Sequence, residues 1–162
     1  MPSPARTGVT TYATPTDREV VITRVVDAPR RIVWEAYTTP RHLRQWMLGP
    51  EGWTMPECEM DLRPGGAFRY VWRKASGTEL TIAGAIREVV ALERLVTTES
   101  WGPEWPETIN TVAFTESSGQ TTITLTVAYP SKEARDAALQ TGMKDGMDPS
   151  FARLDELVRT LV

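Results

Sequence analysis

Cysteine and histidine are nearly absent from this sequence, which contains one of each, Cys58 and His42. A single cysteine excludes an internal disulfide, and it is typical of a protein of the reducing cytoplasm, where we expect this one. Two such residues also fall short of the three or four ligands that a zinc site needs. We therefore expect no metal ion and no cofactor.

Long apolar runs and an excess of positive charge are also missing. No uncharged apolar stretch approaches the ~18 residues of a membrane-spanning helix, and the N-terminus lacks the apolar region of a secretion signal. The 162 residues carry a formal net charge of −3. Nucleic acids and anionic membranes bind basic patches, so we expect neither as a partner. The composition, with 41% hydrophobic and 24% charged residues, is that of one globular domain, and it predicts no particular oligomeric state.

The first part of the chain divides into an arm, a strand and two helices. Residues 1–17 are rich in Pro, Ser, Thr and Gly, which predicts a flexible arm ahead of a single domain over residues 18–162. β-branched residues predict a strand over residues 19–26. Pro29 and Pro40 each lie where a short helix would begin, because proline at the first helical position loses no hydrogen bond.

The second part of the chain reads as strands followed by a helical tail. Alternating apolar residues between Trp53 and Tyr129 predict about six consecutive strands joined by short turns, and hence an antiparallel meander. Ser131 can cap the tail, and Pro149 predicts a kink or a break in it. A curved antiparallel sheet that buries a long C-terminal helix, with two short helices at one end, is the helix-grip arrangement. The predicted fold is therefore α+β, with one antiparallel sheet of six or seven strands.

Four segments of the chain resemble one known family. They are "ITRVVDAPRRIVWEAYTTPRHLRQWMLGPEGWT", "DLRPGGAFRYVWR", "GAIREVVALERLVTTESW" and "GMKDGMDPSFARLDELV". Together they resemble bacterial activator of Hsp90 ATPase homologues (AHSA1-like proteins), which belong to the START-like, or SRPBCC, superfamily of polyketide cyclases and lipid-transport proteins. The resemblance implies a helix-grip fold with an apolar cavity between the sheet and the long helix.

The chain departs from the family pattern at two positions that we expect near the cavity. Met47 follows Trp46 where relatives commonly carry a second tryptophan. Met147 follows Gly146 where relatives often have Gly-Trp, and Pro149 comes soon after. The ligand of a relative is therefore not transferred to this chain.

The function that we favour is non-catalytic binding of a small apolar molecule, aromatic or lipid-like, in the cavity. The fold implied by the resemblance, an aromatic interior and the lack of a catalytic triad support this reading. Glycines at positions 142 and 146 also leave room in the last helix, beside two adaptable methionines. We expect nine residues to contact the ligand: Trp46, Trp53, Phe68, Tyr70, Trp72, Trp101, Met143, Met147 and Phe151.

Three other functions remain open at this point. The first is an Hsp90 co-chaperone-like interaction module, which we disfavour because residues 1–18 are too few to form the separate N-terminal domain of the activator. The second is an enzyme resembling a polyketide cyclase or dehydratase, to which Arg69, Tyr70 and Glu99 could contribute. The third is a resistance protein that sequesters a toxic metabolite.

Several polar residues have simpler structural interpretations. We expect His42 to be solvated on the polar side of its helix. Cys58 lies between two glutamates, which disfavour a reactive thiolate. Glu57, Glu59 and Asp61 alternate along a strand, which predicts a solvated outer face.

Overall fold

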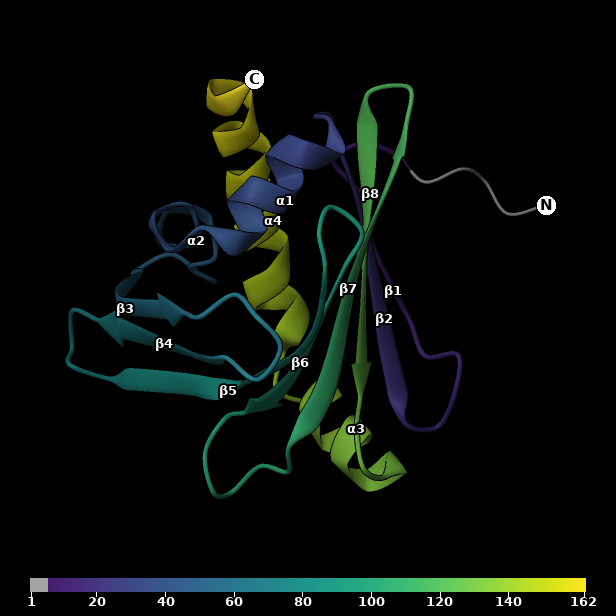
Figure 1. The fold of residues 1–162 in the computed structure, drawn as a ribbon. Helices are drawn as coiled ribbons and strands as arrows, with labels where there is room; N and C mark the ends of the chain where they lie inside the picture. The colour runs from purple at the N-terminus through teal and green to yellow at the C-terminus, as the bar shows by residue number, and fades with distance from the viewer. Residues whose placement is uncertain (1–5) are drawn as a thin grey trace.

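A computed structural model of the protein describes residues 6–162 (Figure 1). The strands are β1 (Thr10–Ala13), β2 (Glu19–Val26), β3 (Trp53–Met60), β4 (Ala67–Lys74), β5 (Glu79–Val90), β6 (Arg94–Ser100), β7 (Thr108–Ser117) and β8 (Gln120–Ala128). The helices are α1 (Arg30–Thr38), α2 (Pro40–Trp46), α3 (Lys132–Leu139) and α4 (Met143–Leu161).

All eight strands belong to one antiparallel sheet with the order β1-β2-β8-β7-β6-β5-β4-β3. Strands β3 to β8 are a meander of consecutive neighbours, and β2 pairs with β8 from Glu19 opposite Ala128 to Val26 opposite Thr121. The α+β class and the antiparallel sheet predicted from the sequence are confirmed. The sheet has eight strands, however, rather than six or seven.

The additional strand is β1, within the segment that the sequence predicts as a flexible arm. Residues 10–13 pair with β2, and the hydroxyl group of Tyr12 donates a hydrogen bond of 2.7 Å to Asp148 Oδ1 in α4. Composition did not indicate this strand because a short edge strand needs few apolar residues when its neighbour supplies the pairing. Residues 1–5 of the predicted arm lie outside the described residues.

The sheet curves around α4 (Figure 1). Strands β3 to β5 cross the lower left of the view, whereas β7, β8 and β2 stand upright at the right, and α4 runs between the two halves. Helices α1 and α2 cover one end of this space and α3 lies at the other. The curve brings backbones together at Gly84, where a Cβ atom would lie 1.8 Å from the carbonyl oxygen of Thr98. A side chain at position 84 would therefore force the strands apart.

Helix α4 continues through Pro149 from Met143 to Leu161, so the kink or break predicted at this proline is wrong. The helical tail is interrupted earlier, at Gly142, which has φ of 80° and separates α3 from α4. Glycine adopts this left-handed conformation without steric cost, so the chain turns there. At the start of the tail, Ser131 caps α3 as predicted, since its hydroxyl oxygen accepts a 3.1 Å hydrogen bond from the backbone N–H of Ala134.

Polar contacts fix α4 against the sheet and against the loop after α2. Arg24 of β2 forms an ion pair with Asp155 of α4, and its guanidinium lies over the ring of Phe151. On the other side, the backbone N–H of Gly49 donates to Ser150 Oγ at 2.9 Å, and Arg153 donates to the carbonyl oxygen of Gly49 at 2.7 Å. These contacts hold the middle of α4 on both sides, from Ser150 to Asp155.

Candidate functional site

Two of the nine residues expected to bind a ligand lie in the closed core. Trp46 and Phe151 are each 1% exposed, and their rings stack at 6.1 Å with an interplanar angle of 19°. The indole N–H of Trp46 donates to the carbonyl oxygen of Ala36 at 2.9 Å. Trp46 therefore joins α2 to α1 and α4.

Four of the nine form a continuous row on the concave face of the sheet. Phe68 and Tyr70 of β4 lie 5.2 Å apart, and Tyr70 is 6.0 Å from Trp72. Trp72 in turn stacks on Trp101 at 5.8 Å with an interplanar angle of 7°. Trp101 is 39% exposed, so this aromatic row runs from the interior to the surface. Tyr70 connects the row to the rest of the interior, since it packs against each of the three hydrophobic clusters found among residues 6–162.

The remaining three lie apart from this row. Met143 and Met147 project from the first turns of α4 and are partly buried against the main core. Trp53 is the first residue of β3, and the ammonium nitrogen of Lys74 lies over its ring, 5.0 Å from the ring centroid. The gap expected beside Gly146 is closed by the loop after α2, since a Cβ atom there would meet Pro50 at 3.8 Å.

Seven apolar or aromatic side chains that pack against the main core are only partly buried. Two come from β3, one from β4, one from β8, one from the residue that follows β8, and two from α4. They are Cys58, Met60, Tyr70, Leu125, Tyr129, Met143 and Met147. In a fully packed core these apolar and aromatic groups would be inaccessible. Their incomplete burial shows that solvent reaches part of each of these side chains.

A buried polar row lies on the same concave face. Thr108 and Asn110 of β7 are 5% and 7% exposed, and the Thr108 hydroxyl group donates to Asn110 Oδ1 at 2.7 Å. Asn110 Nδ2 then donates to Glu99 Oε2 of β6 at 2.5 Å. Burial raises the pKa of Glu99 to about 7, and the side chain of Trp101 acts in the opposite direction. The carboxyl group is therefore ready to gain or lose a proton near neutral pH.

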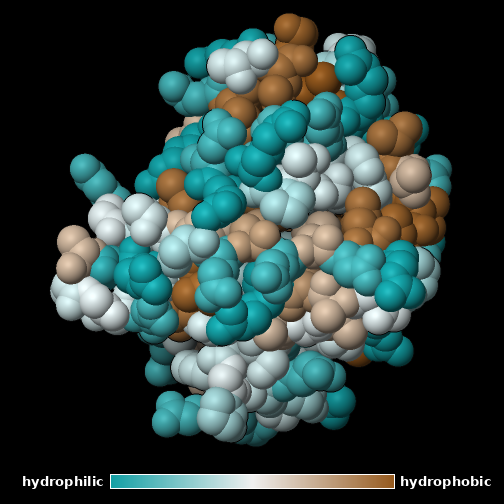
Figure 2. Space-filling model, turned by 60° about the vertical axis from the view of Figure 1, so that its left-hand side comes forward, coloured by the Kyte–Doolittle hydropathy of each residue, from teal (hydrophilic) through white to brown (hydrophobic). Residues whose placement is uncertain are grey.

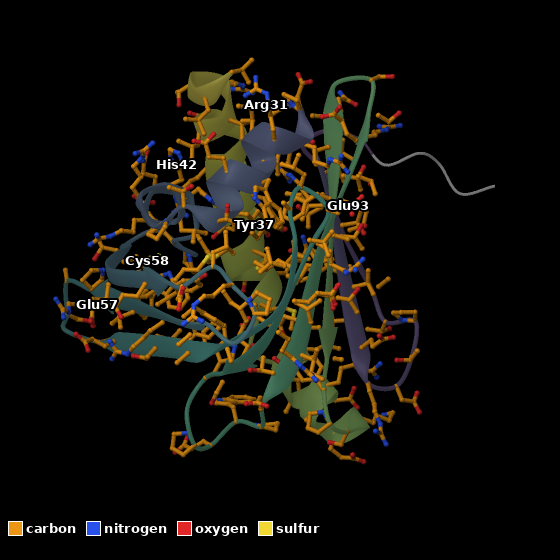
Figure 3. The ribbon with its side chains drawn as sticks, in the orientation of Figure 1. Arg31, Tyr37, His42, Glu57, Cys58 and Glu93 are labelled. Atoms are coloured by element: carbon orange, nitrogen blue, oxygen red, sulfur yellow. The ribbon has the colours of Figure 1, made fainter. Side chains whose placement is uncertain are left out.

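The charge of Glu99 acts on three tyrosines that come from different elements. They are Tyr37 of α1, Tyr70 of β4 and Tyr129, which follows β8. Burial raises the pKa of each phenol, to about 12 for Tyr129, and the negative charge of Glu99 adds to the effect at all three. Figure 3 shows Tyr37 below α1, between that helix and the sheet. The interior thus combines an acid, an amide and three phenols within an apolar surrounding.

Sequence reasoning named Glu99 and Tyr70 for a possible enzyme but missed the rest of this polar group. A signal was present in β7, where the apolar residues Val112 and Phe114 define the inner face. Thr108 and Asn110 share that parity, whereas Ile109 falls on the other face and is 41% exposed. The start of β7 is therefore polar inside and apolar outside, which reverses the usual pattern and marks a buried polar site.

The structure also gives the positions of His42, Arg69 and Cys58, which the sequence singled out as polar or reactive residues. The expectation that His42 is solvated is wrong: it is 4% exposed because α2 turns it inward with Leu43 and Trp46, and its Nε2 lies 3.8 Å from Glu35 Oε1. Arg69 points out of the sheet and forms a 2.9 Å ion pair with Glu57. Cys58 faces inward, and burial raises the pKa of its thiol to about 11, which opposes thiolate formation.

Hollows are also present on the surface of residues 6–162, outside this interior. One, of about 510 Å³, lies along the outer side of α4 near α2, and the other, of about 190 Å³, lies between α4 and the segment before β1. None of the nine expected ligand contacts lines either of them. Figure 2 shows a mostly hydrophilic face with small hydrophobic patches, one of them at the top, at the height of the C-terminal end of α4.

Two classes of feature are absent from residues 6–162. In that part of the chain no three histidine, cysteine, aspartate or glutamate side chains come together in a way that could hold a metal ion. None of the helices described there combines the length and the apolar character needed to cross a membrane.

Comparison with solved structures gives the same fold in several bacterial proteins. A crystal structure of a protein from Rhodobacter sphaeroides has a TM-score of 0.88 at 26% identity, covering 95% of this chain and 100% of that one. Protein Ms6760 from Mycobacterium smegmatis has a TM-score of 0.82 at 25% identity, covering 92% of this chain and 96% of that one. An AHSA1-like protein from Aeromonas hydrophila has a TM-score of 0.70 at 20% identity, covering 85% and 93% of the two chains, a likeness of fold alone.

No curated protein matches this sequence. One protein-family model, however, matches most of the chain. The family model described as "Activator of Hsp90 ATPase homolog 1-like protein" matches residues 27–159, a span that runs from the residue after β2 almost to the end of α4. The chain therefore belongs to the activator of Hsp90 ATPase homolog 1-like family.

Proposed function

We propose that this protein binds a small apolar molecule in the space between the concave face of the sheet and α4. The observation that carries the proposal is the incomplete burial of inward-facing side chains there, above all Tyr70, Met143 and Met147. Membership of a START-like family is compatible with the proposal. The ligand would contact the three inner rings of the aromatic row, Phe68, Tyr70 and Trp72.

Entry of a ligand needs side chains that can move. Methionine has three rotatable bonds and a polarisable sulfur, so Met143 and Met147 can rearrange at low cost. Cys58 and Leu125 lie on the opposite side of the space, on strands that do not need to move. We therefore expect the first turns of α4 to yield to a ligand while the sheet keeps its shape.

Filling the space with protein atoms tests the proposal. Cys58→Leu adds an apolar side chain that points inward from β3. If the space is loosely packed, the variant keeps or gains stability and loses binding of an apolar fluorescent probe such as anilinonaphthalene sulfonate. If the interior is already full, the added atoms cost about 1–3 kcal/mol of unfolding free energy.

The matched control is Glu59→Leu, which adds the same side chain on the exposed face of the same strand. Its stability and probe binding should equal those of the unchanged protein. The proposal is wrong if Cys58→Leu is destabilised while probe binding stays the same, or if the unchanged protein binds no probe.

A further inference from the structure

The loop between β6 and β7, residues 101–107, is joined to the rest of the structure mainly through one side chain. All of its residues except Gly102 are exposed. Within residues 6–162, the backbone hydrogen bonds of the loop stay local: Trp105 N–H donates to the carbonyl oxygen of Gly102 at 3.2 Å, and Gly102 N–H donates to Ser100 Oγ at 3.4 Å. Figure 1 shows the loop extending past the ends of both strands at the lower left. A segment with so few contacts outside itself can move while the sheet keeps its shape.

Trp101 makes the contacts that hold this loop in place. Its ring stacks on Trp72 of β4 at 5.8 Å with an interplanar angle of 7°. Its side chain also hydrogen-bonds the Glu99 carboxyl group. Trp72 is fixed from another direction, because its indole N–H donates to the carbonyl oxygen of Met47 at 2.7 Å. The exposed Trp101 ring therefore covers Trp72, which is 8% exposed, at the surface end of the aromatic row.

The carboxyl group that holds Trp101 is itself fixed to the sheet. Asn110 Nδ2 donates to Glu99 Oε2, and the Thr108 hydroxyl group donates to Asn110 Oδ1 at 2.7 Å. Glu99 therefore stays with β6 and β7 when the loop moves. Gly102, which follows Trp101, has φ of 118°, and a Cβ atom there would meet nothing within 4 Å. Because glycine changes backbone conformation at low steric cost, residue 102 can act as the hinge of the loop.

The charge of Glu99 determines how strongly its contact with Trp101 holds. Burial raises the pKa of Glu99 to about 7, and the hydrogen bond from Trp101 acts in the opposite direction. A donor that lowers the pKa of an acid binds the ionised form more strongly, because the two equilibria are linked. Hydrogen bonds to ionised groups are also roughly twice as strong as those between neutral groups. Loss of the Glu99 proton should therefore tighten the contact, and gain of the proton should loosen it.

The other groups around Glu99 do not change charge near neutral pH. The titratable groups on which its charge acts are three phenols, from α1, from β4 and from the residue after β8: Tyr37, Tyr70 and Tyr129. Burial raises the pKa of each phenol further above neutral. In the sheet register Glu99 lies opposite Gly84 and Thr108, which carry no charge. Glu99 takes part in none of the ion pairs among residues 6–162, so none competes with Trp101 for the carboxylate.

We propose that residues 101–107 are a lid over the surface end of the aromatic row, closed when Glu99 is ionised and released when Glu99 is protonated. In the closed form the Trp101 ring lies on Trp72, as the structure shows. In the released form Trp101 leaves Trp72, and water reaches the concave face of β4 from this end. The lid movement goes beyond the proposed function, whereas its role, to admit a ligand, rests on that function.

Fluorine NMR of protein labelled with fluorotryptophan measures the lid through Trp72. The six tryptophans give one signal each, and Trp72→Phe identifies the signal of Trp72 by removing it. The change of this signal between H₂O and D₂O reports how far water reaches the ring. From about pH 8.5 to about pH 5.5, we expect the ratio of open to closed lid to rise about fivefold, which makes the Trp72 signal more sensitive to solvent. If Trp101 were only packed in place, Trp72 would be equally covered at both pH values.

Two variants should remove this pH dependence. Glu99→Gln keeps an acceptor for a hydrogen bond but cannot ionise, and Trp101→Phe keeps a ring that stacks but loses the indole N–H. In each variant the solvent sensitivity of Trp72 should be the same at both pH values. Trp105→Phe, in the same loop, and Glu59→Gln, on the exposed face of β3, are the controls and should follow the unchanged protein. Circular dichroism confirms that each variant is folded.

The outcomes for the lid and for the proposed function can be told apart. A Trp72 signal whose solvent sensitivity is constant with pH in the unchanged protein would overturn the inference and leave the proposed function intact. A pH dependence that persists in Glu99→Gln or in Trp101→Phe would do the same. If the exposure of Trp72 follows pH as expected while the protein binds no fluorescent probe, the lid is confirmed and the proposed function is wrong.

Discussion

The Glu99 carboxyl group should make the stability of this protein depend on pH in a direction opposite to that of most acidic residues. Burial raises its pKa in the folded state to about 7, whereas the unfolded value is near ~4.3. The folded state therefore holds a proton that the unfolded state has already lost between these two values. As pH rises through this window, the unfolded state gains stability by losing the proton, whereas the folded state keeps it. The free energy of unfolding therefore falls, and the fall is complete above about pH 7.

The size of this penalty follows from the two pKa values. Each pKa unit corresponds to about 1.36 kcal/mol, so complete ionisation of Glu99 costs about 4 kcal/mol, of which about 3 kcal/mol falls between about pH 4 and pH 8. Glu99→Gln removes the ionisation but keeps an oxygen that can accept the hydrogen bond from Asn110. The free energy of unfolding of Glu99→Gln minus that of the unchanged protein should therefore rise by about 3 kcal/mol between about pH 4 and pH 8.

Urea unfolding followed by circular dichroism at several pH values measures this difference directly. Glu59→Gln, on the exposed face of β3, is the control and should follow the unchanged protein at every pH. A difference between Glu99→Gln and the unchanged protein that stays constant with pH would refute the reasoning. It would mean that water or an unrecognised partner solvates Glu99 as well in the folded state as in the unfolded state.

Three further predictions concern other parts of the structure. Phe151→Ala should lower the free energy of unfolding by about 3–5 kcal/mol in urea titrations, because it opens a cavity beside Trp46, and a loss below ~1 kcal/mol would contradict the packing described. Asp155→Ala should lower the free energy of unfolding by about 3 kcal/mol or more, since it leaves Arg24 buried without its partner. An unchanged melting temperature in thermal unfolding would argue against the pair. Cys58 should react with iodoacetamide more slowly than free cysteine at neutral pH, as followed by mass spectrometry, because burial raises its pKa to about 11, and rapid alkylation would show an accessible thiolate.

The fold was largely predictable because its signals are local and repeated. Alternation identified the strands from β3 to β8, and prolines marked the starts of α1 and α2. Two features depended on tertiary context. Strand β1 exists through pairing with β2 and the bond from Tyr12 to Asp148, and neither is visible in a short polar segment. The last helix runs through Pro149 because the loop after α2 and the sheet hold it on both sides, which outweighs the local preference of proline.

The candidate site was only partly predictable for the same reason. The inward direction of Phe68, Tyr70 and Trp72 follows from the strand period, and the structure places all three on the concave face. Which aromatic residues pack together and which line open space depends on helix positions, so Trp46 could not be assigned to the closed core from sequence. The link from Thr108 through Asn110 to Glu99 crosses from one strand to its neighbour, and only the register shows it.

Native mass spectrometry of freshly purified protein tests the central claim, that the interior is a ligand site, most directly. The account predicts a population heavier than the polypeptide by the mass of a small molecule, which denaturation releases and which Cys58→Leu fails to retain. A mass equal to that of the polypeptide, unchanged after incubation with anilinonaphthalene sulfonate, would contradict it and would mean that the space beneath α4 is an ordinary core.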